Sequence, residues 1–217
     1  MRIIALNGSP RKDWNTATLL QKALEGATSQ GAETELHHLY ELNYRGCVSC
    51  FACKVRNGSS YGKCAVRDEL SAILENIEEV DAILLGSPIY FGTATGEMKS
   101  FMERLLFPYT PYTDPPATLF PRKIRTGFIY TMNATEQASS ERGYDRYVKA
   151  TGMIMERIFG AAEVLCSYDT CQFDDYSRYV APRFDPLHKA KRRAEAFPEE
   201  CARAFAMGAG FVRDRFR

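Results

Sequence analysis

Two loops of this sequence carry residue types that bind anionic and aromatic ligands. Residues 8–17, GSPRKDWNTA, combine hydroxyl, amide and basic side chains just before a helical pattern. The unpaired N–H groups and partial positive charge of a helix start would add to these donors, which suits a phosphate. The loop has neither the G-x-G-x-x-G pattern of dinucleotide sites nor the G-K-[ST] ending of triphosphate loops. It therefore predicts a monophosphate site; the alternative is that Asn15 or Thr16 only caps the helix.

The second loop, residues 86–96, reads GSPIYFGTATG and links an apolar strand pattern to a helical one. Tyr90 and Phe91 lie between glycines, so two aromatic rings would stand beside exposed backbone amides. Such a wall suits a flat tricyclic ring that must be both gripped and hydrogen-bonded. The alternative is an aromatic pair that only packs in the core.

Four of the seven cysteines lie close together, at Cys47, Cys50, Cys53 and Cys64. On a helix the third of these would rotate away from the first two, so converging thiolates require a loop, and the glycines nearby favour one. Four thiolates can hold an iron–sulfur cluster or zinc, and free or redox-active thiols are the remaining alternative. We expect the four side chains to converge within a few ångströms of one another, whether or not a metal is bound.

These loops are positioned by a regular alternation of strand and helix patterns, which predicts a doubly wound parallel α/β sheet with helices on both faces. The second strand is the most polar, which places it at an edge and favours the order 2-1-3-4-5. In such a sheet, ligands bind beyond the carboxyl ends of the strands, where both loops would lie. The expected strands are 2–6, 33–39, 82–85, 124–131 and 164–168; the expected helices start near 16 and 70 or cover about 98–106, 144–159 and 199–213.

Length and charge limit the classes of function. A chain of 217 residues fits one domain, 1–217, with a C-terminal helical extension from about 187. The 28 Lys and Arg against 27 Asp and Glu indicate no nucleic-acid or membrane partner, so a small-molecule partner is expected. With neither a signal-peptide pattern nor a stretch of about 18 apolar residues, we expect a cytoplasmic protein.

Taken together, GSPR…NTATLL and GSPIYFGTATGEMKSFMER resemble the NADPH-dependent FMN reductase family of flavodoxin-like proteins. The resemblance implies a flavodoxin-like fold and an FMN-dependent oxidoreductase that passes electrons from NAD(P)H through bound FMN to a small acceptor such as a quinone or free flavin. It implies no catalytic side chain, because the flavin carries the chemistry. By the same resemblance, the phosphate would lie against Ser9, Arg11, Asn15, Thr16 and Ala17, the isoalloxazine against Pro88, Ile89, Tyr90, Phe91 and Gly92, and its other edge against Thr131, Met132 and Asn133.

The cysteine motif is similar to that of the iron–sulfur flavoproteins, a branch of the same superfamily, although the ten-residue gap before Cys64 is longer than theirs. This likeness implies a [4Fe-4S] cluster at Cys47, Cys50, Cys53 and Cys64 that relays electrons from the flavin. A non-catalytic FMN-binding sensor is a further alternative.

The family resemblance also favours a homodimer or homotetramer. Residues 107–122 hold five prolines and the aromatic residues Phe107, Tyr109, Tyr112 and Phe120. Because prolines lower the entropy lost on ordering and exposed rings offer apolar contact area, we expect this loop in or near the subunit contact.

Overall fold

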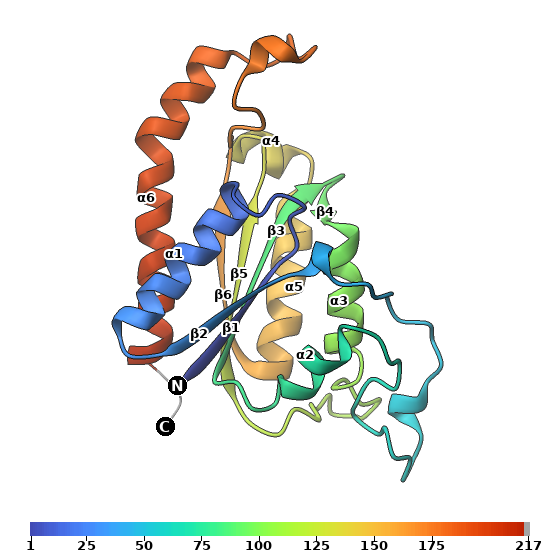
Figure 1. Cartoon of the computed structure of the whole chain (residues 1–217). Coiled ribbons are helices and arrows are strands. Elements are labelled where there is room, and N and C mark those ends of the chain that lie inside the picture. Colours follow the sequence, from blue (N-terminus) through green and yellow to red (C-terminus); the bar gives the residue numbers. More distant parts are fainter. Residues whose placement is uncertain (215–217) are drawn as a thin grey trace.

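A parallel sheet in the order β2-β1-β3-β5-β6 forms the centre of the molecule (Figure 1). The computed structural model describes residues 1–214. The strands are β1 (Arg2–Asn7), β2 (Glu33–His38), β3 (Ala82–Tyr90), β5 (Ile124–Thr131) and β6 (Gly160–Ser167). The predicted strand order is confirmed, with the polar β2 at one edge. One feature was not predicted: the short β4 (Thr93–Ala94) folds back antiparallel onto the end of β3.

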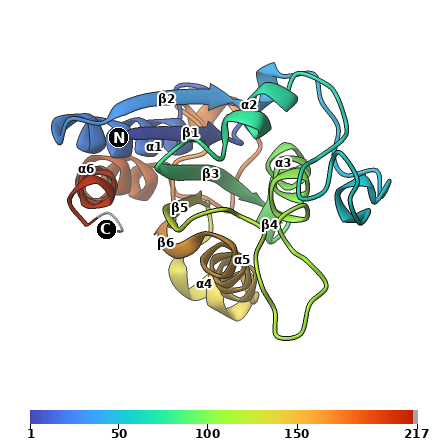
Figure 2. The same cartoon turned by 90° about the horizontal axis from the view of Figure 1, so that it is seen from below.

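Helices cover both faces of the sheet, as Figures 1 and 2 show. On β1, Ile3 and Ala5 belong to the core beneath α1 and α6, whereas Ile4 and Leu6 belong to the core beneath α3 and α5. This alternation buries the strand on both faces and explains its continuous apolar sequence.

Within residues 1–214, none of the helices is long and apolar enough to cross a membrane. The helices are α1 (Asn15–Ser29), α2 (Ser71–Asn76), α3 (Gly96–Leu106), α4 (Glu136–Glu141), α5 (Tyr144–Phe159) and α6 (Pro186–Arg213).

The last helix starts at Pro186, so the helix expected over 199–213 and the helical extension expected from about 187 form one continuous helix. Asp185 caps it by accepting a hydrogen bond from the N–H of Leu187, and a proline in the first turn is compatible with helix geometry. Pro198, one residue before the expected start, lies inside this helix. The additional turns extend beyond the carboxyl edge of the sheet and bring α6 over the loops that follow β5 and β6 (Figure 1).

The aromatic residues of the loop 107–122 are divided between core and surface. Tyr109 and Phe120 are buried and pack edge-to-face at 5.0 Å between ring centroids, and Phe120 packs against Phe159 at 4.8 Å. Only Tyr112 is largely exposed, at 77%. The expectation that all these rings are exposed is therefore wrong, because the loop folds back over the end of α5. The oligomeric state stays a prediction.

Candidate functional site

The two loops that are predicted to bind a ligand meet in one pocket at the carboxyl edge of the sheet, where the strand order reverses between β1 and β3. The loops after β5 and β6 complete it. The pocket encloses about 170 Å³. It is lined by Ser9, Arg11, Trp14, Asn15, Thr16, Pro88, Ile89, Tyr90, Thr131, Met132, Asn133, Thr170, Cys171 and Gln172.

The start of α1 forms one side of this pocket. Trp14 is the residue just before the helix, and its side chain makes no capping hydrogen bond. In the described first turn of α1 there is also no acidic residue. Thr16 is instead hydrogen-bonded to Thr131 at 2.8 Å between hydroxyl oxygens, and Asn15 donates to the carbonyl oxygen of Cys171 at 2.8 Å. The capping alternative is therefore wrong. The helix start keeps its positive end toward the pocket beside Ser9 and Arg11, a donor set whose chemistry fits a phosphate.

The end of β3 forms the apolar wall, through Pro88, Ile89 and Tyr90. The chain then turns sharply at Phe91 and Gly92, whose φ angles are 51° and 84°, and returns as β4. Phe91 is fully exposed at the tip of this hairpin and Tyr90 is 46% exposed, so the alternative of a core-packing aromatic pair is wrong. Phe91, Gly92 and the buried Ala17 lie outside the set of residues that line the pocket.

Residues 170–172, in the loop after β6, also line the pocket, but they were not among the site residues predicted from the sequence. The indole N–H of Trp14 donates to the carbonyl oxygen of Cys171 at 3.1 Å, and Arg11 donates to that of Gln172 at 2.5 Å. The start of α1 thus holds this loop in place. The signal that could have found it is its position: it follows another parallel strand, so it must emerge at the same sheet edge.

The four cysteines line one shared cavity with Phe51 and Phe107, under the end of α3. Cys47 and Cys50 are exposed, Cys53 is buried and Cys64 is half-buried. Burial raises the pKa of the Cys53 thiol. The predicted convergence within a few ångströms is wrong: the four cysteines line the same cavity, but no three His, Cys, Asp or Glu side chains in residues 1–214 are placed to hold a metal ion. As they stand, the four thiols do not fit a metal centre, although their chemistry suits one.

A buried cation, Arg104 of α3, holds this cysteine loop against the body of the protein. Its Nε donates to the sulfur of Cys64 at 3.3 Å, and its terminal nitrogens donate to Asp68 at 2.5 Å and to the carbonyl oxygens of Arg45 and Val66 at 3.0 and 2.9 Å. The side chain is fully buried, so it depends on these partners for compensation. Because α3 starts directly after the apolar wall of the pocket, one helix supports both regions.

The sheet order and the pocket at its switch point define a flavodoxin-like protein. The sequence profile of the NADPH-dependent FMN reductase family matches residues 1–133, more than half of the chain. The chain therefore belongs to the NADPH-dependent FMN reductase family.

Two curated relatives are iron–sulfur flavoproteins. An iron–sulfur flavoprotein of Methanocaldococcus jannaschii is 38% identical over 104 residues, 48% of this chain and 51% of that protein. Another, of Archaeoglobus fulgidus, is 34% identical over 155 residues, 71% of this chain and 65% of that protein. The matched stretch thus spans about half of the first relative and under two thirds of the second.

The fold is shared with two enzymes of known structure. A NAD(P)H:quinone oxidoreductase from Methanothermobacter marburgensis superposes with a TM-score of 0.69 at 16% identity, covering 100% of this chain and 98% of that one. An azoreductase from Bacillus anthracis superposes with a TM-score of 0.68 at 13% identity, covering 97% and 100%. At these identities the likeness shows the fold alone.

Proposed function

We propose that this chain binds one FMN in the pocket between the α1 start and the β3 end and passes electrons from NAD(P)H to a small acceptor such as a quinone or free flavin. The observation that carries the proposal is that a phosphate-type helix start and an apolar wall, far apart in the sequence, line the same pocket. Membership of the FMN reductase family supports the same ligand.

In this proposal each wall has a separate task. When bound, FMN supplies a ring that exchanges a hydride with a nicotinamide and passes electrons on. Ser9, Arg11 and the first-turn amides of α1 bind the phosphate, while Ile89 and Tyr90 hold the ring. The volume of about 170 Å³ is below the roughly 300–1,000 Å³ of pockets that enclose a ligand, so part of the ligand would stay open to the acceptor.

The proposal is tested by the ligand that the purified protein carries. Protein as purified, or loaded with flavin, is expected to release FMN and not FAD on heating, because the pocket offers one phosphate-type helix start, which suits a single phosphate. Chromatography of the released flavin is the measurement. The loaded protein is then expected to oxidise NADH or NADPH with ferricyanide or a quinone as acceptor. Flavin binding without turnover would favour the sensor alternative, and no flavin binding would reject the proposal.

A second candidate function is electron relay through an iron–sulfur cluster. It is favoured by the shared cavity of the four cysteines and by the names of the curated relatives. For a cluster to form, the loop around Ser49 and Phe51, both in the left-handed region, would have to rearrange and bring the sulfurs together.

Reconstitution with iron and sulfide under oxygen-free conditions tests this candidate. If the loop can close, a broad absorbance near about 400 nm should appear beneath the flavin bands, since Fe–S clusters are held by Cys thiolates. Cys50→Ala should abolish the absorbance, while Cys201→Ala, on α6 and outside the cavity, should leave it unchanged. An unchanged flavin spectrum with free thiols would leave only the simple FMN reductase.

A further inference from the structure

A buried lysine lies behind the wall of the pocket that the loops after β5 and β6 form. Lys189, in the first turn of α6, is only 2% exposed. Its ammonium group donates to Asp169 Oδ1 and to Asn133 Oδ1, each at 2.5 Å, and lies 3.4 and 3.3 Å from the carbonyl oxygens of Asn133 and Thr170. A charge so far from water is tolerated only with such partners.

Stability alone does not explain this arrangement. A buried ion pair contributes little to stability over a well-packed apolar pair, because desolvation of both charges offsets their attraction. What distinguishes Lys189 is that two of its hydrogen-bond partners line the pocket. Asn133 and Thr170 both line the pocket, and they belong to two different loops that the ammonium group ties together.

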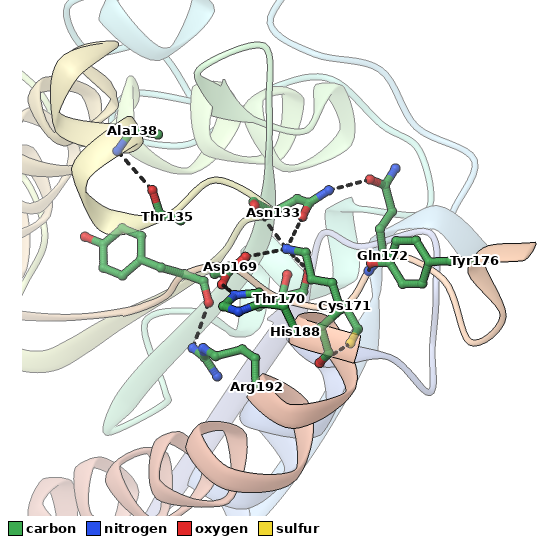
Figure 3. A network of polar contacts seen from close by, with 12 residues as sticks. Asn133, Thr135, Ala138, Asp169, Thr170, Cys171, Gln172, Tyr176, His188 and Arg192 are labelled. Atoms are coloured by element: carbon green, nitrogen blue, oxygen red, sulfur yellow. Dashed lines mark hydrogen bonds and ion pairs between the residues drawn. The ribbon is translucent and has the colours of Figure 1, made fainter. Parts of the chain in front are cut away.

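The contacts form a chain from the exposed His188 to Gln172, which lines the pocket; Figure 3 draws this network with its contacts as dashed lines. The exposed His188 contacts Asp169 Oδ2 at 2.6 Å, and the other carboxylate oxygen of Asp169 accepts from Lys189. Lys189 donates to Asn133 Oδ1, and Asn133 Nδ2 donates to Gln172 Oε1 at 2.8 Å. Although burial opposes it, bonding to Lys189 and His188 lowers the pKa of Asp169, so the carboxylate stays charged opposite the ammonium group.

This chain fixes which end of the Asn133 side chain can serve a ligand. The cation occupies the amide oxygen, so the amide nitrogen must face the other way, toward Gln172 and the pocket. An amide has two N–H protons, of which one goes to Gln172 and the other can go to a ligand. A cation on the oxygen also polarises the amide and makes its N–H a stronger donor.

We propose that Lys189 is a positioning residue that, through Asn133, presents a cation-polarised N–H donor to bound FMN and thereby favours the reduced, more negatively charged flavin. The inference rests on the proposed function. A donor polarised by a cation gains most from the ligand state with more negative charge, because charge-assisted hydrogen bonds are about twice as strong as neutral ones. Lys189 thus shifts the balance between the two redox states as well as holding the wall in place.

The test compares the affinities for oxidised and reduced FMN, obtained from titration and from the shift in flavin midpoint potential on binding. Lys189→Met is expected to lower the preference for reduced FMN by about tenfold, the scale of one hydrogen bond to a charged group. Lys191→Met removes the same charge from an exposed position on the same helix, where the partner is Glu195, and should leave the preference unchanged.

A second readout needs no flavin. Trp14 is the only tryptophan of the chain and donates to Cys171, next to Thr170, so its fluorescence reports the position of this wall. In flavin-free protein, Lys189→Met should shift the Trp14 emission and Lys191→Met should not.

The outcomes separate this inference from the proposed function. If wild-type protein binds no FMN, both are rejected. If it binds FMN, but Lys189→Met weakens both redox states equally or changes neither, only the role of Lys189 is overturned. Should Lys189→Met fail to fold, Asn133→Ala keeps the buried ion pair and removes only the amide that reaches the pocket. It must show the same loss of preference, and an unchanged preference would overturn the inference.

Discussion

Gly208→Ala is expected to lower the free energy of unfolding by about 3 kcal/mol, the upper end of the usual cost of overpacking. Gly208 lies where α6 crosses α1, and a Cβ there would stand 1.7 Å from the carbonyl oxygen of Ala23 and 2.6 Å from its carbon. Both atoms belong to the backbone of α1, so no side chain can rotate away and the helices must separate. For a chain of this size the melting temperature should fall by roughly 6–12 °C, measured by calorimetry or circular dichroism.

Gly210→Ala is the matched control, two residues further along the same helix. Its Cβ would meet nothing closer than Asp214 Oδ2 at 3.9 Å, an ordinary contact. Because alanine is the better helix former, this variant should be more stable than the wild type by roughly 0.5–1 kcal/mol. Equal melting temperatures for the two variants would contradict the close packing of α1 on α6.

The parts of the fold that were predictable are those encoded over short stretches of sequence. The β1 run RIIALN is apolar because both faces are buried, and its end at Asn7 and Gly8 is marked by turn residues. The helical stripe of α5 matches Tyr144–Phe159 because its apolar face packs mainly on the neighbouring strands β5 and β6. Given these elements, the general rule for doubly wound sheets supplies the order and the position of the pocket.

What could not be predicted depends on contacts between residues far apart in the sequence. In the stretch around HKAKRR, Lys189 reads as one of several solvated basic residues, yet it is buried because its partners come from two distant strand ends. Arg104 likewise lies on a helix whose sequence gives no sign that the cysteine loop wraps over it. Local sequence patterns predict helices and strands, whereas the partners of a buried charged side chain depend on how those helices and strands pack together.

Pro198, inside α6, shows a different limit of prediction from sequence. Pro198 is a strong local signal for a helix boundary, since a proline removes one backbone donor. It was overridden because contacts on both sides of it hold the helix together. Arg193 stacks on the ring of Phe197 at 4.0 Å, and Glu200 accepts from Ser167 at 2.6 Å, which anchors the helix to the end of β6.

Arg11→Ala is expected to weaken FMN binding by about ten- to a hundredfold while changing riboflavin binding by only a few-fold. Arg11 lines the pocket beside the start of α1, so in the proposed function its guanidinium meets the phosphate, which riboflavin lacks. A hydrogen bond to a charged group contributes roughly 1.5–3 kcal/mol, which sets the range of the effect. Because Arg11 is exposed, the difference between wild type and variant should shrink as salt is added. Fluorescence titration of both ligands at two salt concentrations is the measurement.

Lys12→Ala provides the control for net charge, because Lys12 is the adjacent exposed cation but pairs with Glu41 and does not line the pocket. Any effect of overall charge on the FMN dianion should appear equally in both variants, so an FMN-specific loss confined to Arg11→Ala locates the phosphate at the start of α1. Arg11 also donates to the carbonyl oxygen of Gln172, and its loss could loosen the wall. A loosened wall would weaken FMN and riboflavin to the same extent. Equal losses of affinity for the two ligands would therefore show that the phosphate does not bind at this loop.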